Sequence, residues 1–357
     1  MFLINRRALA AIGVTAAAIG STALLSAPAQ AAAAGTAKVV GAGTVQFTAL
    51  AGKVNGLTIT VSGRTVTLDD TVAINAGAGC AAIAGDKTKV TCTTTGATSA
   101  LTVSLGDKND WVKNKTAVYL NANGGAGNDK IYGGSASDRL TGGTGNDYIV
   151  GGNGNDAIYG QAGNDVVYGQ NGNDSVSAGA GNDKVYGQAG NDKLYGGTGA
   201  DLLNGSTGLD KIYGQAGNDV IYAGAGEVNG EGDVVYGGAG NDKINGESGA
   251  DELYAGSGND TVSGGTGDDL LMGESGTDSL SGGAGYDFLV GESVTSTLLP
   301  AGSTKAKDKL YGGANIDLCI SPKGAKYSSC EYKKWSDYID SLTGSSAAVA
   351  GRLNKIA

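Results

Sequence analysis

Aspartate recurs at a fixed interval through the middle of the chain, in a setting that suits a cation ligand. From Gly124 onward the sequence runs GGAGNDKIY, GGSASDRLT, GGTGNDYIV, GGNGNDAIY, with a period of nine residues. Carboxylates and the backbone carbonyls of Gly-rich turns are the oxygen ligands of Ca²⁺. Mg²⁺ requires stricter octahedral geometry, and Zn²⁺ prefers His or thiolate ligands that this motif lacks.

We number the repeat from its first Gly, so that this aspartate occupies position 6. An insertion after Asp219 and a longer one after Asp287 interrupt the register, which then resumes. About twenty repeats result, and their candidate metal ligands are Asp129, Asp138, Asp147, Asp156, Asp165, Asp174, Asp183, Asp192, Asp201, Asp210, Asp219, Asp233, Asp242, Asp251, Asp260, Asp269, Asp278, Asp287, Asp308 and Asp317.

The residues around each aspartate predict a short strand and a turn. Position 8 is apolar, as at Ile131, Leu140 and Ile149, and one inward residue between outward neighbours is a minimal strand. The six residues before it are rich in Gly, Asn and Ser, which is typical of a turn. Two repeats then form one coil, and strands of repeats i and i+2 lie parallel, ~4.8 Å apart. Without a cation, the stacked carboxylates would repel one another.

This pattern resembles the Gly-Gly-x-Gly-x-Asp-x-apolar-x repeat of RTX (hemolysin-type) calcium-binding proteins. The resemblance covers residues 124–320 and implies a parallel β-roll that binds Ca²⁺ in its turns and folds only when Ca²⁺ is present. The alternative of a disordered Gly-rich linker does not account for an apolar residue at every ninth position. Departures from the motif are Ala136 and Asn315 at position 4, Gln161, Gln170, Gln188 and Gln215 at position 2, Ala178, Ala223 and Ala255 at position 1, and Cys319 at position 8.

Tyrosine often occupies position 9, and two interpretations are open. An aromatic strip on the sheet faces could bind a ligand, or tyrosine could simply cover the strand surface because of its high β-propensity. The tyrosines concerned are Tyr132, Tyr159, Tyr168, Tyr186, Tyr195, Tyr213, Tyr222, Tyr236 and Tyr254.

Composition narrows the possible functions. The 357 residues include no His, which excludes Ser-His-Asp and Cys-His catalysis and His-ligated metals. Asp and Glu outnumber Lys and Arg by 35 to 25, for a net charge of −10, and an acidic chain is a poor nucleic-acid binder. No zinc-protease or lipase motif is present in a suitable setting, so we expect no enzyme. A hydrolase or toxin with an accessory roll is the alternative.

The first 31 residues have the pattern of an export signal. Arg6 and Arg7 precede an Ala-rich apolar run, and the small residues of segment 27–31 predict cleavage after Ala31. An uncleaved anchor is the alternative. We expect the general secretory route rather than twin-arginine export, because the repeats would fold only where Ca²⁺ is abundant. The localisation expected is secreted and extracellular.

Four cysteines in an exported chain predict two disulfides. Three pairings are possible, and the two local ones, Cys80 with Cys92 and Cys319 with Cys330, need no long-range assembly. Free buried thiols are the alternative.

The flanking segments predict two smaller parts. Residues 36–121 hold several Thr- and Val-rich strand patterns, which predict a small β-rich module. Within it, residues 106–112 form a degenerate repeat, and Asp69 with Asp70 predicts a turn rather than a carboxylate pair. This segment resembles the N-terminal part of secreted actinobacterial RTX proteins. Residues 321–357 predict a short helical C-terminal cap, which that family would pin by Cys319–Cys330.

These patterns together predict an all-β protein of four parts: a signal peptide (1–31), an N-terminal module (36–121), a calcium-binding β-roll (122–320) and a cap (321–357). The expected function is non-catalytic binding of several Ca²⁺ ions by a monomer. Adhesion or matrix organisation through the sheet faces, with a cell-surface or matrix ligand, is compatible with that function.

Overall fold

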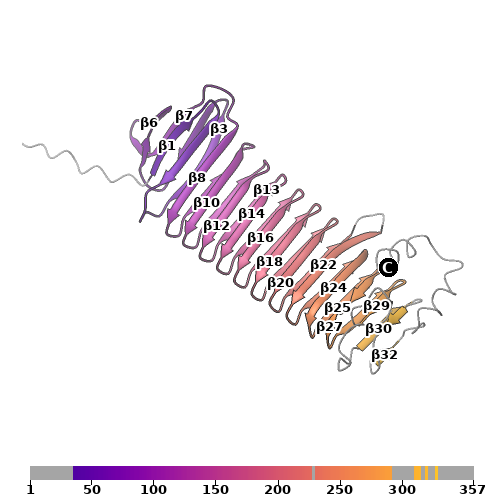
Figure 1. Cartoon of the computed structure of the whole chain (residues 1–357). Helices are drawn as coiled ribbons and strands as arrows, with labels where there is room; N and C mark the ends of the chain where they lie inside the picture. The colour runs from indigo at the N-terminus through magenta and orange to yellow at the C-terminus, as the bar shows by residue number, and fades with distance from the viewer. Residues whose placement is uncertain (1–34, 227–229, 292–308, 315–317, 321–325, 329–357) are drawn as a thin grey trace, which may run out of the picture. The chain divides into compact units, whose positions relative to one another are not determined.

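The computed structural model consists of stacked coils whose strands form two long sheets that face each other (Figure 1). The structure describes residues 35–226, 230–291, 309–314, 318–320 and 326–328. These residues contain strands and no helix, so none of them forms a helix that could span a membrane. The prediction of an all-β, parallel β-solenoid is confirmed.

Strands from consecutive repeats enter opposite sheets, as the nine-residue period predicts. In the first sheet the neighbours run in the order β31 (Leu318–Ile320), β29 (Phe288–Val290), β26 (Leu270–Met272), β24 (Ala250–Gly258), β22 (Glu231–Ala239), β20 (Lys211–Ala216), β18 (Lys193–Thr198), β16 (Ser175–Ala180), β14 (Ala157–Ala162), β12 (Arg139–Thr144), β10 (Tyr119–Ala126), β8 (Ala100–Asp107), β2 (Thr44–Ala49), β1 (Gly35–Val40) and β5 (Ile74–Ala76), with β27 (Ser275–Gly276) beside β24.

The second sheet has the same construction. Its order is β32 (Lys326–Ser328), β30 (Lys309–Ala314), β28 (Ser279–Ala284), β25 (Thr261–Thr266), β23 (Lys243–Ser248), β21 (Val220–Ala225), β19 (Leu202–Thr207), β17 (Lys184–Ala189), β15 (Val166–Asn171), β13 (Tyr148–Asn153), β11 (Lys130–Gly134), β9 (Trp111–Asn114), β3 (Gly56–Ser62), β4 (Thr65–Asp69), β7 (Asp86–Thr93) and β6 (Cys80–Ile83).

The repeat strands are longer than the sequence pattern predicts. A typical strand, β14, has six residues and includes Gly160, Gln161 and Ala162, which we assigned to the following turn. Only positions 4 to 6 remain as the turn. The reason is that position 1 is a second inward residue, small enough for the two sheets to approach, so the alternation of the strand continues through it.

The backbone conformation at position 2 of the repeat favours glycine. The φ there is positive, for example +118° at Gly179 and +116° at Gly152. Gln161 and Gln170 adopt the same region, at +81° and +82°, although side chains with a Cβ pay about 1–2 kcal/mol there. The glutamine substitutions therefore keep the positive φ at this position of the strand, at some cost in stability.

The core is a thin double row of aliphatic side chains. The position-8 residues from Ile131 to Leu289 are almost completely buried, and in register with the residue two repeats away, as for Leu140 and Ile158. The row continues into the N-terminal segment, where Leu57 and Phe47 are also buried. Because β2 pairs with β8 and β3 with β9 in parallel, both sheets pass without a break from the N-terminal segment into the repeats.

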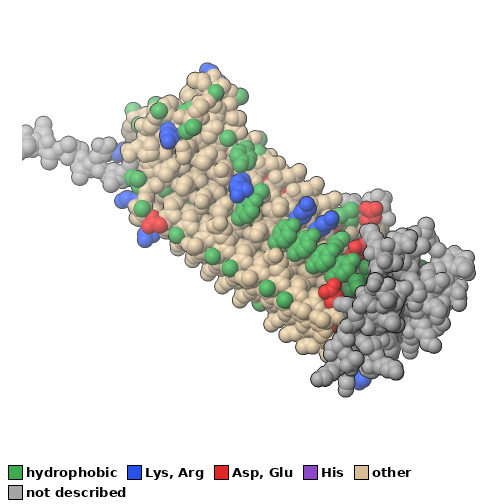
Figure 2. Space-filling model, viewed as in Figure 1, with side chains coloured by type: hydrophobic (Ala, Val, Ile, Leu, Met, Phe, Trp, Pro, Cys, Tyr) green, Lys and Arg blue, Asp and Glu red, His purple; other side chains and the backbone are tan. Residues whose placement is uncertain are grey.

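Tyrosines at position 9 stack on one another along the outer faces. Tyr195, Tyr213, Tyr236 and Tyr254 follow each other with ring centroids 4.8–5.2 Å apart and planes within 5–8° of parallel. Figure 2 shows a row of hydrophobic side chains on one face of the molecule. The ring faces inside this stack are covered by neighbouring rings, which favours surface covering over a binding strip made of ring faces.

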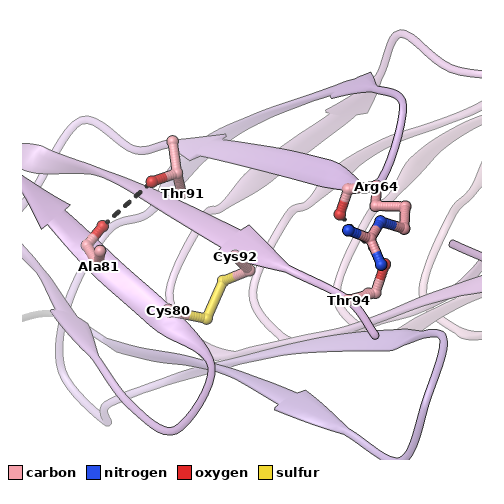
Figure 3. The surroundings of a disulfide bond; sticks show 6 residues. All are labelled: Arg64, Cys80, Ala81, Thr91, Cys92 and Thr94. Carbon is pink, nitrogen blue, oxygen red and sulfur yellow. Dashed lines mark hydrogen bonds between the residues drawn. A yellow bond between two sulfur atoms is a disulfide. The ribbon is translucent and has the colours of Figure 1, made fainter. Parts of the chain in front are cut away.

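One predicted disulfide is present. Cys80 in β6 and Cys92 in β7 are cross-strand partners joined by a disulfide bond (Figure 3). Cys92 is fully buried in the N-terminal core. Cys319 lies in β31, but its predicted partner Cys330 lies outside the described residues, as do the signal peptide, Asp308, Asp317 and all of the predicted cap except β32.

Removing the disulfide should destabilise the N-terminal strands. We expect the double substitution Cys80→Ser and Cys92→Ser to lower the free energy of unfolding by about 3 kcal/mol. Without the disulfide, the unfolded chain regains the conformational entropy that closing a loop of this size removes. Urea unfolding with saturating Ca²⁺, followed by Trp fluorescence, measures the change. An unchanged midpoint would show that β6 contributes nothing to the cooperative unit.

Candidate calcium sites

The aspartates of position 6 are buried at the end of each three-residue turn. Every one from Asp129 to Asp287 has at most 2% of its surface exposed. They form two columns, because consecutive repeats enter opposite sheets. One column belongs to the first sheet (Asp138, Asp156, Asp174, Asp192, Asp210, Asp233, Asp251, Asp269, Asp287), and the other belongs to the second (Asp129, Asp147, Asp165, Asp183, Asp201, Asp219, Asp242, Asp260, Asp278). Each aspartate directly precedes its strand, except that Asp233 and Asp251 lie within β22 and β24.

One carboxylate oxygen of each aspartate binds the coil before it. The N–H of Asp147, for example, donates to Oδ1 of Asp165 at 2.7 Å, and the N–H of Asp129 donates to Oδ1 of Asp147 at 2.8 Å. This ladder also crosses the five-residue insertion, since the N–H of Asp210 donates to Oδ1 of Asp233 at 2.7 Å. The stacking of repeats i and i+2 therefore places a carboxylate at every junction, as we predicted.

A second ladder runs in the opposite direction at position 5. The N–H of Asn164 donates to Oδ1 of Asn146 in the preceding coil at 2.7 Å. Ser137 replaces Asn in one repeat, and its Oγ accepts from the N–H of Asn155 at 2.9 Å. These residues are exposed. The asparagine of the motif thus has a structural role that the sequence did not reveal.

The other carboxylate oxygen, Oδ2, has no hydrogen-bond partner in most repeats although it is buried. This holds for Asp129, Asp138, Asp147, Asp156, Asp165, Asp174, Asp183, Asp192, Asp201, Asp210, Asp219, Asp233, Asp242 and Asp260. A buried acceptor without a partner is costly, and an ionised one more so. A bound cation would satisfy these oxygens.

Burial raises the pKa of these carboxyl groups, and neighbouring carboxylates add to the effect. The pKa of Asp138 is raised to about 7 by desolvation. The pKa of Asp156 and that of Asp210 are raised to about 8 by desolvation and, secondarily, by the flanking carboxylates of their column. Hydrogen bonds from the preceding coil lower these values but do not offset burial.

Where position 1 is glycine, a backbone oxygen lies close to the free Oδ2. A Cβ built on Gly169 would collide with Oδ2 of Asp174 and lie 2.8 Å from the carbonyl oxygen of Gly187 in the next coil. The same arrangement recurs at Gly151, with Asp156 and the carbonyl of Gly169. A carboxylate and a carbonyl oxygen thus converge beside position 1 of these repeats. Both are ligands that Ca²⁺ prefers, so the residues fit this ion.

Acidic side chains alone do not build a site. Within the described ranges, no three His, Cys, Asp or Glu side chains lie together in a way that could hold a metal. Backbone carbonyls would therefore have to complete the coordination, and the role of the individual aspartates as ligands stays a prediction.

The structure adds acidic residues that the sequence analysis did not select. Asp110, in the degenerate repeat 106–112, takes the same place as a position-6 aspartate, because its N–H donates to Oδ1 of Asp129 at 2.8 Å. Asp69 and Asp70 were predicted to form a turn, but Asp69 is the last residue of β4, where it is half-exposed and pairs with Lys89. Asp70 directly follows the strand and is 5% exposed. The degenerate motif was a signal for Asp110, but nothing in the spacing indicated Asp70.

Comparison with known families agrees with this geometry. The model of the RTX calcium-binding nonapeptide repeat, which spans four copies, matches overlapping segments between residues 121 and 289. A search of the curated proteins finds no match. RTX calcium-binding nonapeptide repeats are thus present in the chain, and together with the β-roll they indicate a calcium-binding repeat protein.

Stability without metal should be greatest in acid. The folded state holds protons on carboxyl groups with a pKa of about 7, such as Asp138 and Asp219, that the unfolded chain releases above its pKa of 3.8. The folded fraction of the metal-free protein should therefore fall as the pH rises from 4 to 8. Far-UV circular dichroism of protein freed of metal by dialysis measures this fraction at several pH values, and more β-structure at pH 8 than at pH 4 would contradict the prediction.

A glycine at position 2 should remove backbone strain. Gln170 has a φ of +82° and its side chain is exposed. We expect Gln170→Gly to raise the free energy of unfolding in Ca²⁺ by up to about 1 kcal/mol. Gly152→Gln is the opposite change and should lower it by more in urea unfolding, because a Cβ on Gly152 would also collide with the carbonyl oxygen of Gly134 in the adjacent coil.

Proposed function

We propose, from the RTX calcium-binding nonapeptide repeats that residues 121–289 carry, that this protein is a secreted, non-catalytic calcium-binding protein that folds upon binding Ca²⁺ outside the cell. The observation that carries the proposal is the free Oδ2 of buried aspartates in successive coils, as in Asp147, Asp156 and Asp165. A carboxylate that already holds the backbone by one oxygen has its second oxygen available to a cation.

Electrostatics makes the ion part of the folding reaction. Each column places ionised carboxylates one strand apart, and at neutral pH their repulsion and desolvation oppose the fold. When bound, Ca²⁺ supplies the positive charge that offsets both terms. The chain's own contribution is to orient Oδ1 toward the preceding coil, to leave Oδ2 free, and to keep position 1 small.

Two features support an extracellular location. The predicted signal peptide at residues 1–31 would direct export, and the Cys80–Cys92 disulfide is typical of an oxidising compartment. Extracellular Ca²⁺ sites commonly work at about 10⁻⁴–10⁻³ M. The repeats would then stay unfolded in the cytosol and fold after export. The lack of His, and the assignment of the repetitive residues to the roll itself, support a non-catalytic role.

A calcium titration tests the proposal. Far-UV circular dichroism of the purified protein in chelator should show little β-structure, and Ca²⁺ should produce a cooperative rise that Mg²⁺ does not reproduce. A spectrum that is fully β in chelator and unaffected by Ca²⁺ would overturn the coupling between binding and folding. Equilibrium dialysis at saturation would count the bound ions.

Removing the charge of one position-6 aspartate should weaken Ca²⁺ binding at its own site. Asp165→Asn keeps an oxygen to accept from the N–H of Asp147 but loses the carboxylate charge at Oδ2. We expect fewer bound Ca²⁺ ions and a higher Ca²⁺ midpoint. Asp69→Asn is the matched control, because Asp69 is half-exposed and lies outside the repeats. Equal effects of the two substitutions would refute the ligand assignment.

A further inference from the structure

One aspartate column continues beyond the repeats into the N-terminal segment. Oδ1 of Asp110 accepts from the N–H of Asn55 at 2.6 Å, as each repeat aspartate does from the coil before it. Asn55 is fully buried and precedes β3, whose Leu57 takes the place of the position-8 residue Val112. Asn55 is therefore the next member of the column of the second sheet.

Asp70 completes this end of the column. Its Oδ1 accepts from the N–H of Gly56 at 2.7 Å and from that of Thr71 at 2.7 Å. Because β3 pairs with β9 on one side and with β4 on the other, Asp70, which follows β4, approaches β3 from the side opposite Asp110. Two acidic side chains thus flank Asn55.

Each of these three residues has a buried oxygen without a hydrogen-bond partner. The atoms are Oδ1 of Asn55, Oδ2 of Asp70 and Oδ2 of Asp110, and the residues are 0%, 5% and 2% exposed. The cations of Lys89 and Lys108 do not offset them, since they pair with Asp69, Asp86 and Asp107. Two carboxylate oxygens and one amide oxygen therefore lie inside the protein without compensation.

The other column ends in the N-terminal segment without acidic residues. There Oδ1 of Asp138 accepts from the N–H of Leu120 at 2.7 Å. The next residues in register are Leu101 and Val45, and all three apolar side chains are buried. One column ends on apolar residues, whereas its counterpart retains acids, so these acids call for an explanation other than packing.

We propose that Asn55, Asp70 and Asp110 form a divalent-cation site of the calcium type outside the nonapeptide repeats. Asp and Asn oxygens are the side-chain ligands that Ca²⁺ takes in proteins, and the neutral Asn limits the charge to that of two carboxylates. The choice of Ca²⁺ among the hard divalent cations rests on the proposed function of the repeats. Backbone carbonyls and water would complete the coordination.

Such an ion would join three separate segments of the chain. Asn55 precedes β3, Asp70 follows β4, and Asp110 precedes β9. Since β4 also pairs with the disulfide-bonded β7, the ion would tie the N-terminal strands to the first coils of the roll. Calcium would then organise the N-terminal segment as well as the repeats.

Anomalous diffraction from crystals of the purified protein grown with Tb³⁺, which takes the same oxygen ligands as Ca²⁺, tests this directly. An anomalous peak bounded by Asn55, Asp70 and Asp110 is expected in addition to peaks in the repeat turns. Peaks in the repeats with none here would overturn this site and leave the proposed function intact. Absence of peaks in the repeats would overturn the proposed function, and a peak here would still support this site.

Solution measurements give a second readout. Trp111 follows Asp110 and lies against Gly56, so Tb³⁺ at the site should show emission sensitised by this residue. In a Trp335→Phe background, the variant Asp70→Asn should lose a substantial part of that emission, while Asp69→Asn should retain it. Equal emission from both variants would overturn the proposal. Unchanged circular dichroism in Ca²⁺ would verify that each variant is folded.

Discussion

The structure depends on the different roles of the two oxygens in each buried position-6 carboxylate. Oδ1 holds the backbone of the preceding coil, as in the bond from the N–H of Asp147 to Asp165, and this contact forces the whole group out of water. Oδ2 is then buried without a protein partner. The hydrogen bond that joins adjacent coils thus also buries a negative charge, which a bound cation would neutralise. Folding and ion binding are therefore coupled through the same carboxylate.

The glycines of the motif serve this same carboxylate. A glycine at position 1 keeps the space beside Oδ2 free of a Cβ, and the carbonyl of the next position 1 approaches from the following coil, as Gly169 and Gly187 do around Asp174. Position 2 provides the positive φ that the strand adopts directly after this residue. Apolar residues at position 8 contribute a core only two side chains thick, which leaves the turns a large share of the stability.

Much of this could be predicted because the period itself encodes contacts. A nine-residue register with one inward apolar residue requires alternating sheets, and Leu140 does lie beside Ile158. Strand length could not be predicted as well, because Gly160 is typical of a turn by composition yet serves as a small inward residue. Asn55 and Asp70 carried no signal from the period. Asn55 meets Asp110 through pairing of β3 with β9 across 55 residues of sequence, and Asp70 meets Gly56 through pairing of β3 with β4.

The two side-chain ladders also make the ends of the stack chemically different. Aspartate reaches backward along the chain and asparagine reaches forward, as Asp165 and Asn146 do. An aspartate column can stop toward the N-terminus on any residue that offers a peptide N–H, and Leu120 does this without any polar side chain. In the opposite direction, the peptide N–H of each aspartate needs an acceptor from the coil that follows, as that of Asp147 finds in Asp165. A segment that closes one end of the stack therefore cannot substitute for a segment that closes the other.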